Sequence, residues 1–142
     1  MKILLAVDGS RHSLKAVRCL IEHADWYREL PQVELVNVHL PVPRVPGMNA
    51  VVGASQIQRY YDREGKAALA AARKLLDRKG IRYAARLRVG PIAETIVKHA
   101  KLMRCDLIMV GTRGLTAAGN LLLGSTASKL AHVSPVPVLL VK

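Results

Sequence analysis

Residues 111–126, GTRGLTAAGNLLLGST, combine glycines with hydroxyl side chains in a pattern that suits an anion. The segment follows the apolar run 107–110 and contains four glycines before Ser125 and Thr126. Glycine is entropically costly inside regular structure, so its repeated use indicates positions that a side chain would obstruct. A helix that begins near Ser125 would offer amide N–H groups and a partial positive charge to phosphate oxygens. The segment therefore predicts a phosphate-binding site. The alternative interpretation is that its glycines mark two ordinary loop bends.

A carboxylate follows a second apolar run at the start of the chain. Ile3 to Val7 leads directly into Asp8, Gly9 and Ser10. In an open parallel sheet, ligands bind beyond the carboxyl ends of the strands, at the crevice where the strand order reverses. We expect strands 3–7 and 107–110 to flank that crevice, so that Asp8 and the glycine turn at 111–114 arrive at the same place.

The elements that must position these residues alternate along the chain. Short apolar runs rich in β-branched residues alternate with longer segments of helical period, and the strands are expected at 3–7, 33–40, 81–89, 107–110 and 136–141. The alternation predicts an α/β fold with an open parallel five-stranded sheet and helices on both faces. In the third strand Arg82, Arg86 and Arg88 alternate with apolar residues, which suits a sheet edge.

Residues that commonly begin or end helices occur at the expected boundaries of these elements. Ser10 or Ser13 can cap the first helix and Ser55 the second, Gly80 sits where a helix ends, and Pro91 suits the first turn of the third helix. Residues 41–54 contain three prolines, which exclude a helix there. This loop either lies over a site at the carboxyl edge of the sheet or merely connects two elements.

Length and composition indicate one domain, residues 1–142, with an ordinary hydrophobic core. Cys19 and Cys105 lack the spacing of metal ligands and are expected to be small buried residues in a reducing compartment. The first residues are too short for a signal peptide, and no apolar stretch has the length of a membrane span. We therefore expect a cytoplasmic protein without a membrane partner.

The chain is strongly basic, because it contains 22 Lys and Arg residues and only 10 Asp and Glu residues, which gives a net charge of +12. Ten basic and three acidic residues fall between positions 59 and 88. A solvated, charged edge that resists aggregation is the favoured interpretation. Nucleic acid is a possible partner, but the five aromatic residues do not interleave with the basic ones as base stacking would require.

Several catalytic and nucleotide motifs are excluded. Residues 119–126, GNLLLGST, have the skeleton of a P-loop but place Ser125 where the lysine belongs, and GxGxxG does not occur. The five histidines are dispersed and form no triad or metal-ligand pattern, which favours surface or helix-face positions. His39 alone could reach the crevice, and local hydrogen bonds at the end of its strand are the favoured role. No catalytic residue is assigned.

The spacing of Gly111, Gly114, Gly124 and Ser125 is similar to the G-2x-G-9x-G-[S/T] motif of the universal stress protein family, in its ATP-binding branch. The resemblance runs from KILLAVDGS at the start of the chain to VPVLLVK at its end. It implies a Rossmann-like sheet, similar to the adenine nucleotide alpha hydrolases, with the strand order 3-2-1-4-5. It also implies a homodimer in which the last strand, Val136 to Val141, pairs across a two-fold axis.

The resemblance also implies a set of ATP-binding positions. Asp8 would lie near the adenosine with Ala6 close by, and Val38 would contact adenine through its backbone. The ribose and phosphates would lie against Val110, Gly111, Arg113, Gly114, Gly124, Ser125 and Thr126. A Mg²⁺ or Mn²⁺ ion would bind through the phosphates.

Three functions remain open at this point. The favoured one is an ATP-binding regulatory or stress-response protein whose nucleotide shifts its stability or its affinity for partners. The second is a slow ATPase or an adenylyl-transfer enzyme, for which only Asp8 and His39 could serve as a base. The third is a nucleic-acid-associated module that uses the basic face.

Overall fold

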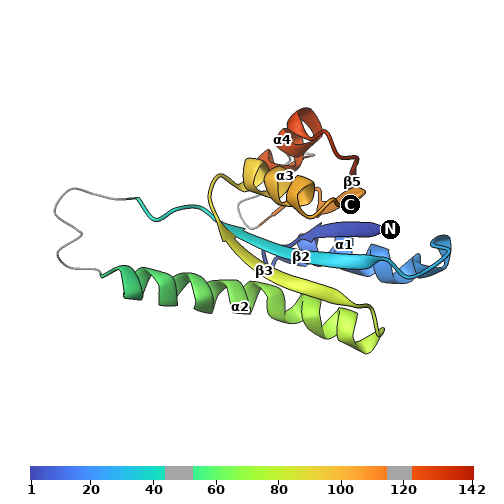
Figure 1. The fold of residues 1–142 in the computed structure, drawn as a ribbon, viewed down its shortest axis with the longest axis horizontal. Helices are drawn as coiled ribbons and strands as arrows, with labels where there is room; N and C mark the ends of the chain where they lie inside the picture. Colours follow the sequence, from blue (N-terminus) through green and yellow to red (C-terminus); the bar gives the residue numbers. More distant parts are fainter. Residues whose placement is uncertain (44–52, 115–122) are drawn as a thin grey trace.

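Strands and helices alternate along the chain as the sequence predicts (Figure 1). The computed structural model describes residues 1–43, 53–114 and 123–142. The elements are β1 (Lys2–Ala6), α1 (Arg11–Glu22), the 3₁₀ helix η1 (Ala24–Trp26), β2 (Gln32–His39), α2 (Ala54–Arg78), β3 (Tyr83–Val89), α3 (Ile92–Leu102), β4 (Leu107–Gly111), α4 (Ser125–Val133) and β5 (Val138–Val141).

The five strands form one parallel sheet in the order β3-β2-β1-β4-β5. Central strand β1 pairs on both sides, so that Ile3 lies opposite Val33 on β2 and Leu107 on β4. This arrangement confirms the predicted α/β fold, its strand order and the edge position of β3. The order reverses between β1 and β4, which places a crevice at their carboxyl ends.

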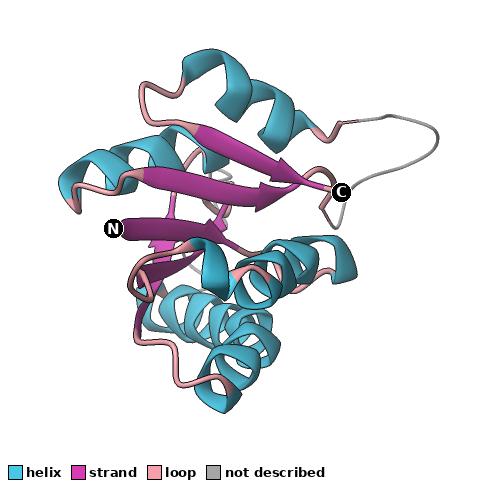
Figure 2. Cartoon of the chain, turned by 90° about the vertical axis from the view of Figure 1, so that its right-hand side faces the viewer, coloured by secondary structure: helices cyan, strands magenta, loops and turns pink. Residues whose placement is uncertain are grey.

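Helices cover both faces of the sheet, and each face has its own hydrophobic core (Figures 1 and 2). On one face Leu20 of α1 and Leu76 of α2 pack with Leu5 of β1. On the other face Ile96 of α3 and Leu130 of α4 pack with Ile108 of β4. Because every central strand is covered on both sides, β1 and β4 are almost continuously apolar.

The helix ends confirm some of the predicted caps and correct one. Ser10 caps α1, and its Oγ accepts a hydrogen bond from the Ser13 amide at 3.0 Å. The prediction that Ser55 caps α2 is wrong, because the helix begins at Ala54 and Gly53 is the capping residue. There the Gln56 side chain reaches back and accepts from the Gly53 amide at 3.1 Å, so no hydroxyl cap is needed.

Two other helix ends follow the predictions closely. Gly80 has a φ of +64° just beyond α2, a conformation that favours glycine at the end of a helix. Pro91 directly precedes α3, one residue before the first turn in which it was expected. The fixed φ of proline and its missing N–H are compatible with the position just before a helix as well as with its first turn.

Two strands are shorter than the sequence suggests. The third begins at Tyr83 and not at residue 81, and the last begins at Val138 and not at residue 136. Before β5, Ser134 Oγ accepts from the Val136 amide at 3.2 Å and donates to the Val136 carbonyl at 2.6 Å. This local turn keeps Val136 out of the strand pairing.

The proline-containing segment 41–54 falls partly outside the described residues. Residues 41–43 are irregular and Ala54 already belongs to α2, whereas residues 44–52 lie outside the described part of the chain, as does Gly119. The N-terminal turns of α2 extend beyond the sheet on the left of Figure 1. Among the described residues, no helix is long and apolar enough to cross a membrane.

Candidate functional site

A cavity of about 610 Å³ opens at the carboxyl edge of the sheet, where the strand order reverses. Its volume lies in the range of about 300 to 1,000 Å³ that small-molecule sites commonly have. All ten positions named from the family resemblance line this one cavity: Ala6, Asp8, Val38, Val110, Gly111, Arg113, Gly114, Gly124, Ser125 and Thr126. The fold thus brings together four chain segments that are far apart in the sequence.

Part of the cavity lining is apolar. Val36 and Val38 come from β2, Ile92 and Ile96 come from α3, and Tyr60 of α2 lines the cavity with residues 40–43. Ile92 and Ile96 belong to a segment whose helical period predicts an amphipathic helix, and they are not among the site residues that the sequence predicts. Helical periodicity identifies a buried face but does not distinguish a core from a cavity wall, so the sequence held no signal for this role.

The start of α4 also lines the cavity. Gly124 is the capping residue and has no side chain, and no side-chain cap is present at this helix. The first amides of a helix have no acceptor within the helix, so those of Ser125, Thr126 and Ala127 are donors at the cavity. The half-buried Arg113 adds a positive charge to the lining. The combination favours an anionic group.

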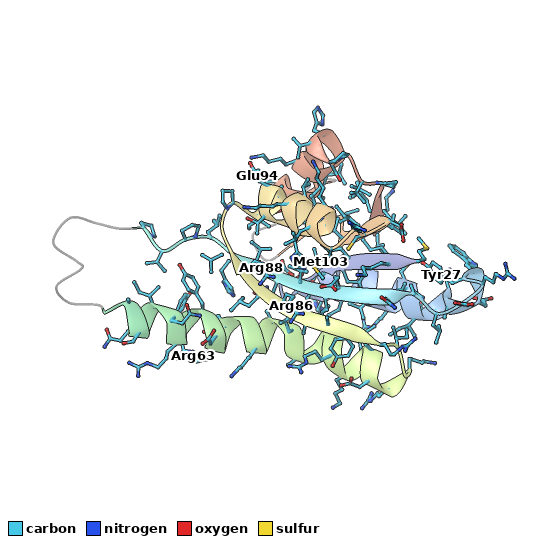
Figure 3. The ribbon with its side chains drawn as sticks, in the orientation of Figure 1. Tyr27, Arg63, Arg86, Arg88, Glu94 and Met103 are labelled. Carbon is cyan, nitrogen blue, oxygen red and sulfur yellow. The ribbon has the colours of Figure 1, made fainter. Side chains whose placement is uncertain are left out.

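A main-chain hydrogen bond joins the start of α4 to the residue that follows β4. The Gly124 amide donates to the Thr112 carbonyl at 2.7 Å, so this N–H group is already used within the protein. Lys129 of α4 pairs with Glu94 of α3, which is labelled in Figure 3. A hydrogen bond from Lys129 lowers the pKa of the Glu94 carboxyl. Contacts with both β4 and α3 therefore fix the position of the helix.

The glycine that ends β4 and the glycine three residues later serve different purposes. A Cβ on Gly111 would lie 2.5 Å from the main-chain oxygen of His12, so this glycine lets β4 pack closely against α1. A Cβ on Gly114 would lie 2.6 Å from Oδ2 of Asp8. Packing between β4 and α1 therefore accounts for the glycine at position 111, whereas the glycine at position 114 lies beside the Asp8 carboxylate.

The carboxylate of Asp8 is held in a tight turn between β1 and α1. Its Oδ1 accepts from the Ser10 amide at 2.9 Å, and its own amide donates to Ser13 Oγ at 3.3 Å. Gly9 has a φ of +82°, which lets the chain turn back on itself at this point. The half-buried Asp8 is thus oriented at the cavity by the start of α1.

Two polar side chains of β2 also belong to the cavity lining. Asn37 is 2% exposed and its Nδ2 donates to the Val7 carbonyl at 2.8 Å. Its Oδ1 and the Nε2 of His39 are buried without a hydrogen-bond partner among the described residues. The expectation that His39 reaches the site agrees with its place in the lining, whereas its Nε2 lacks the local hydrogen bond that was expected.

A second group of buried polar residues lies between β2 and α3, outside the cavity. His99 Nε2 lies 3.3 Å from Oε2 of Glu34, and the two side chains are 2% and 7% exposed. Of the two positions predicted for the histidines, on the surface or on a helix face, His99 has the second, on α3, where it is buried with Glu34 as its polar partner. Burial raises the pKa of the nearby Cys105 thiol to about 11, whereas Cys19 is only half-buried.

The fold and the site together define an open α/β protein with a ligand cavity at the switch point of its sheet. The model of the universal stress protein family matches residues 1–142, and the chain therefore belongs to this family. A universal stress protein of Thermus aquaticus is 34% identical over 145 residues, which cover 99% of this chain and 97% of its relative.

Solved structures support the same assignment. The protein MJ0577 of Methanocaldococcus jannaschii superimposes with a TM-score of 0.82 at 26% identity, over 99% of this chain and 94% of its own. A universal stress protein solved in complex with cAMP has a TM-score of 0.67 at 26% identity, over 99% and 95% of the two chains. A relative of similar sequence and fold thus binds an adenine nucleotide.

Proposed function

We propose that this chain is an ATP-binding regulatory protein of the universal stress protein family. The observation that carries the proposal is the cavity itself, whose lining combines apolar side chains with a helix start that has no side-chain cap. An adenine ring requires apolar walls, and a phosphate chain requires N–H donors and positive charge. The relative in complex with cAMP supports an adenine nucleotide as the ligand.

In this proposal different parts of the cavity lining bind different parts of the nucleotide. Adenine lies against the apolar side chains and contacts the backbone of Val38, while Asp8 and Ala6 lie near the adenosine. Val110 and Gly111 flank the ribose and the first phosphates. Arg113 and Gly114 run along the triphosphate, and the amides and hydroxyls of Ser125 and Thr126 bind it, with Gly124 leaving room for close approach.

A divalent cation fits this arrangement as part of the ligand. The described residues contain no group of three or more His, Cys, Asp or Glu that could hold a metal by themselves. Mg²⁺ is commonly bound through substrate phosphates, water and one or two carboxylates, and Asp8 is the carboxylate of the cavity. Mg²⁺ or Mn²⁺ would neutralise phosphate charge at this position.

The regulatory effect follows from preferential binding to one state of the protein. A ligand at a hundred times its Kd stabilises the folded state by about 2.7 kcal/mol. The nucleotide would join β1, β2, β4 and α4 at one place, so it would rigidify the carboxyl edge of the sheet. Partners that contact this edge would then distinguish the loaded from the empty protein.

Titration calorimetry with Mg²⁺ and ATP tests the proposal. Replacement Gly124→Leu places a side chain at the start of α4 and should abolish binding, whereas the fold should persist because a Cβ there meets only ordinary contacts of 3.4 Å or more. Gly53→Leu is the matched control, since Gly53 also caps a helix but lies outside the cavity lining. Unchanged binding by Gly124→Leu would refute the proposed site.

The identity of the nucleotide can be tested independently. Mass spectrometry of small molecules released from freshly purified protein should detect ATP or AMP. Competition with AMP and cAMP then ranks the ligands. Release of an unrelated metabolite would overturn the choice of ATP, while the cavity would remain the binding site.

We propose further that the protein is a homodimer through β5. This strand is at the edge of the sheet, and Leu139 is 38% exposed there. Pairing of two such edges would cover apolar side chains and main-chain groups that a monomer leaves open. Sedimentation equilibrium should give twice the monomer mass, and a monomer at every concentration would contradict this part of the proposal.

A further inference from the structure

Strand β3 turns one row of main-chain groups away from the sheet. It is an edge strand and pairs only with β2. The Arg82 carbonyl accepts from the Val33 amide at 3.1 Å, and the Gly90 amide donates to the His39 carbonyl at 2.9 Å. Successive residues of a strand alternate in the side to which their N–H and C=O groups point. The main-chain groups of even-numbered residues therefore face β2, and those of the odd-numbered residues Tyr83, Ala85, Leu87 and Val89 face outward. Of these, the Leu87 carbonyl already accepts a hydrogen bond of 3.1 Å from Nη1 of Arg88.

A row of basic side chains on α2 runs beside this edge. Arg73 Nε lies 3.4 Å from Oη of Tyr83, which places this side of α2 next to β3. Lys66 and Arg59 precede Arg73 by two and four turns of the helix, so they lie on nearly the same side. All three are exposed. With a rise of about 1.5 Å per residue, the row extends over roughly 21 Å.

A second basic row lies on the other face of β3. Arg86 is opposite Val36 and Arg88 is opposite Val38, and these valines belong to the core beneath α3 and α4. Arg82 has the same parity, so all three arginines project from the face away from α2. Figure 3 labels Arg86 and Arg88 along the strand. At about 3.3 Å per residue this row also extends over roughly 20 Å.

We propose that the β3 edge is the docking site for an extended acidic peptide segment of a partner protein, which adds to the sheet as a sixth strand. An added strand pairs its main chain with the outward groups of β3. The side chains of the added strand would alternate between the two faces of the sheet. On each face, carboxylates of the peptide would pair with the basic row that lies there. Only three acidic residues stand among the ten basic ones at 59–88, and one of them, Glu64, already pairs with Arg63.

The same charges explain why the edge does not pair with itself. A second copy of β3 would bring like charges together on both faces, which is unfavourable. The charges therefore disfavour pairing of two β3 edges and favour pairing of β3 with an acidic strand. This inference concerns a surface distinct from the nucleotide cavity and does not rest on the proposed function.

Nucleic acid is the competing polyanion, and the surface favours it less. Single-stranded nucleic acid needs exposed rings for base stacking. Tyr83, the ring beside both the strand edge and the α2 row, is half-buried and its hydroxyl contacts Arg73. A duplex would use the charges alone and would gain little from the outward amides of β3. This difference makes the two partners separable by experiment.

The test uses fluorescence anisotropy with labelled oligo-glutamate and, in parallel, a short labelled DNA duplex of mixed sequence. Ala85→Pro removes an outward N–H group without removing a bond to β2, which an edge strand tolerates. We expect it to weaken peptide binding by at least about tenfold, the equivalent of one or two hydrogen bonds. Duplex binding should be unaffected by the same variant, and circular dichroism checks that the fold persists.

Charge variants and hydrogen exchange complete the test. Arg86→Glu should weaken peptide binding strongly, whereas Arg18→Glu on α1 is the matched exposed control and should have little effect. With the peptide bound, the amides of Tyr83, Ala85 and Leu87 should gain protection from exchange. The proposal is overturned if Ala85→Pro binds the peptide as well as the natural protein does, or if the duplex binds and the peptide does not.

Discussion

The amide of Gly124 donates a hydrogen bond of 2.7 Å to the carbonyl oxygen of Thr112. This bond joins the start of α4 to the end of β4, although the two segments are separated in the sequence by residues 115–122, which lie outside the described part of the chain. It consumes one N–H group of the helix start and leaves the next three amides at the cavity. The glycines near this junction consequently differ in what their replacement should do.

Replacement Gly111→Ala should destabilise the protein. The new Cβ would lie 2.5 Å from the His12 main-chain oxygen, and neither β4 nor α1 can move without repacking. Overpacking of this kind costs about 1 to 3 kcal/mol, sometimes more. Urea unfolding should show the loss, while Gly124→Ala should change the free energy of unfolding little because its contacts are ordinary. Equal stability of the two variants would contradict the packing role of Gly111.

Replacement Gly114→Ala should affect ligand binding and leave stability nearly unchanged. Its Cβ would lie 2.6 Å from Oδ2 of Asp8, which is the end of a side chain and can shift. The shift would displace the carboxylate at the cavity and weaken nucleotide binding by about tenfold, the equivalent of roughly 1.4 kcal/mol. Calorimetry and urea unfolding on the same sample separate the two effects. A loss of stability equal to that of Gly111→Ala would argue against this prediction.

Replacement His99→Ala should be strongly destabilising without affecting the cavity. It would leave the buried Glu34 carboxyl without its partner at 3.3 Å. Removing one member of a buried pair costs about 3 to 5 kcal/mol. The double variant Glu34→Leu with His99→Leu should recover much of this loss, because no uncompensated polar group remains. Thermal unfolding of both variants measures the difference, and a double variant as unstable as the single one would disprove the pairing argument.

The Cys105 thiol should make stability depend on pH at the alkaline end. Burial raises its pKa from an ordinary value of 9.0 to about 11 in the folded protein. Between these values the unfolded chain has lost the proton and the folded chain retains it, so the free energy of unfolding falls as the pH rises from about 9 to about 11. Cys105→Ala should flatten this part of the profile. Alkylation in a Cys19→Ser background should remain slow below this range.

Several features of this protein were predictable from local chemistry. The alternation of apolar runs with amphipathic segments predicted the five strands and the helices that cover them, because periodicity records which face of an element is buried. The positions of Asp8 and Gly111 at the ends of two apolar strands predicted their meeting at the carboxyl edge. The alternating arginines of β3 predicted its place at the edge of the sheet.

Other features depended on contacts between segments that are distant in the sequence. Ile92 and Ile96 of α3 line the cavity, and His99 has a buried carboxylate on β2 as its partner. At the start of α2, Gly53 is the capping residue in place of the expected serine, and the Gln56 side chain accepts from its amide.

The sequence by itself therefore determined the order of the strands and helices and the types of residue that lie at the carboxyl edge of the sheet. Both depend on residue type and spacing along one segment. Only the tertiary structure decided which residues close the cavity and which glycines serve packing. Those outcomes depend on what lies opposite a residue in space, and a local pattern carries no information about its opposite partner.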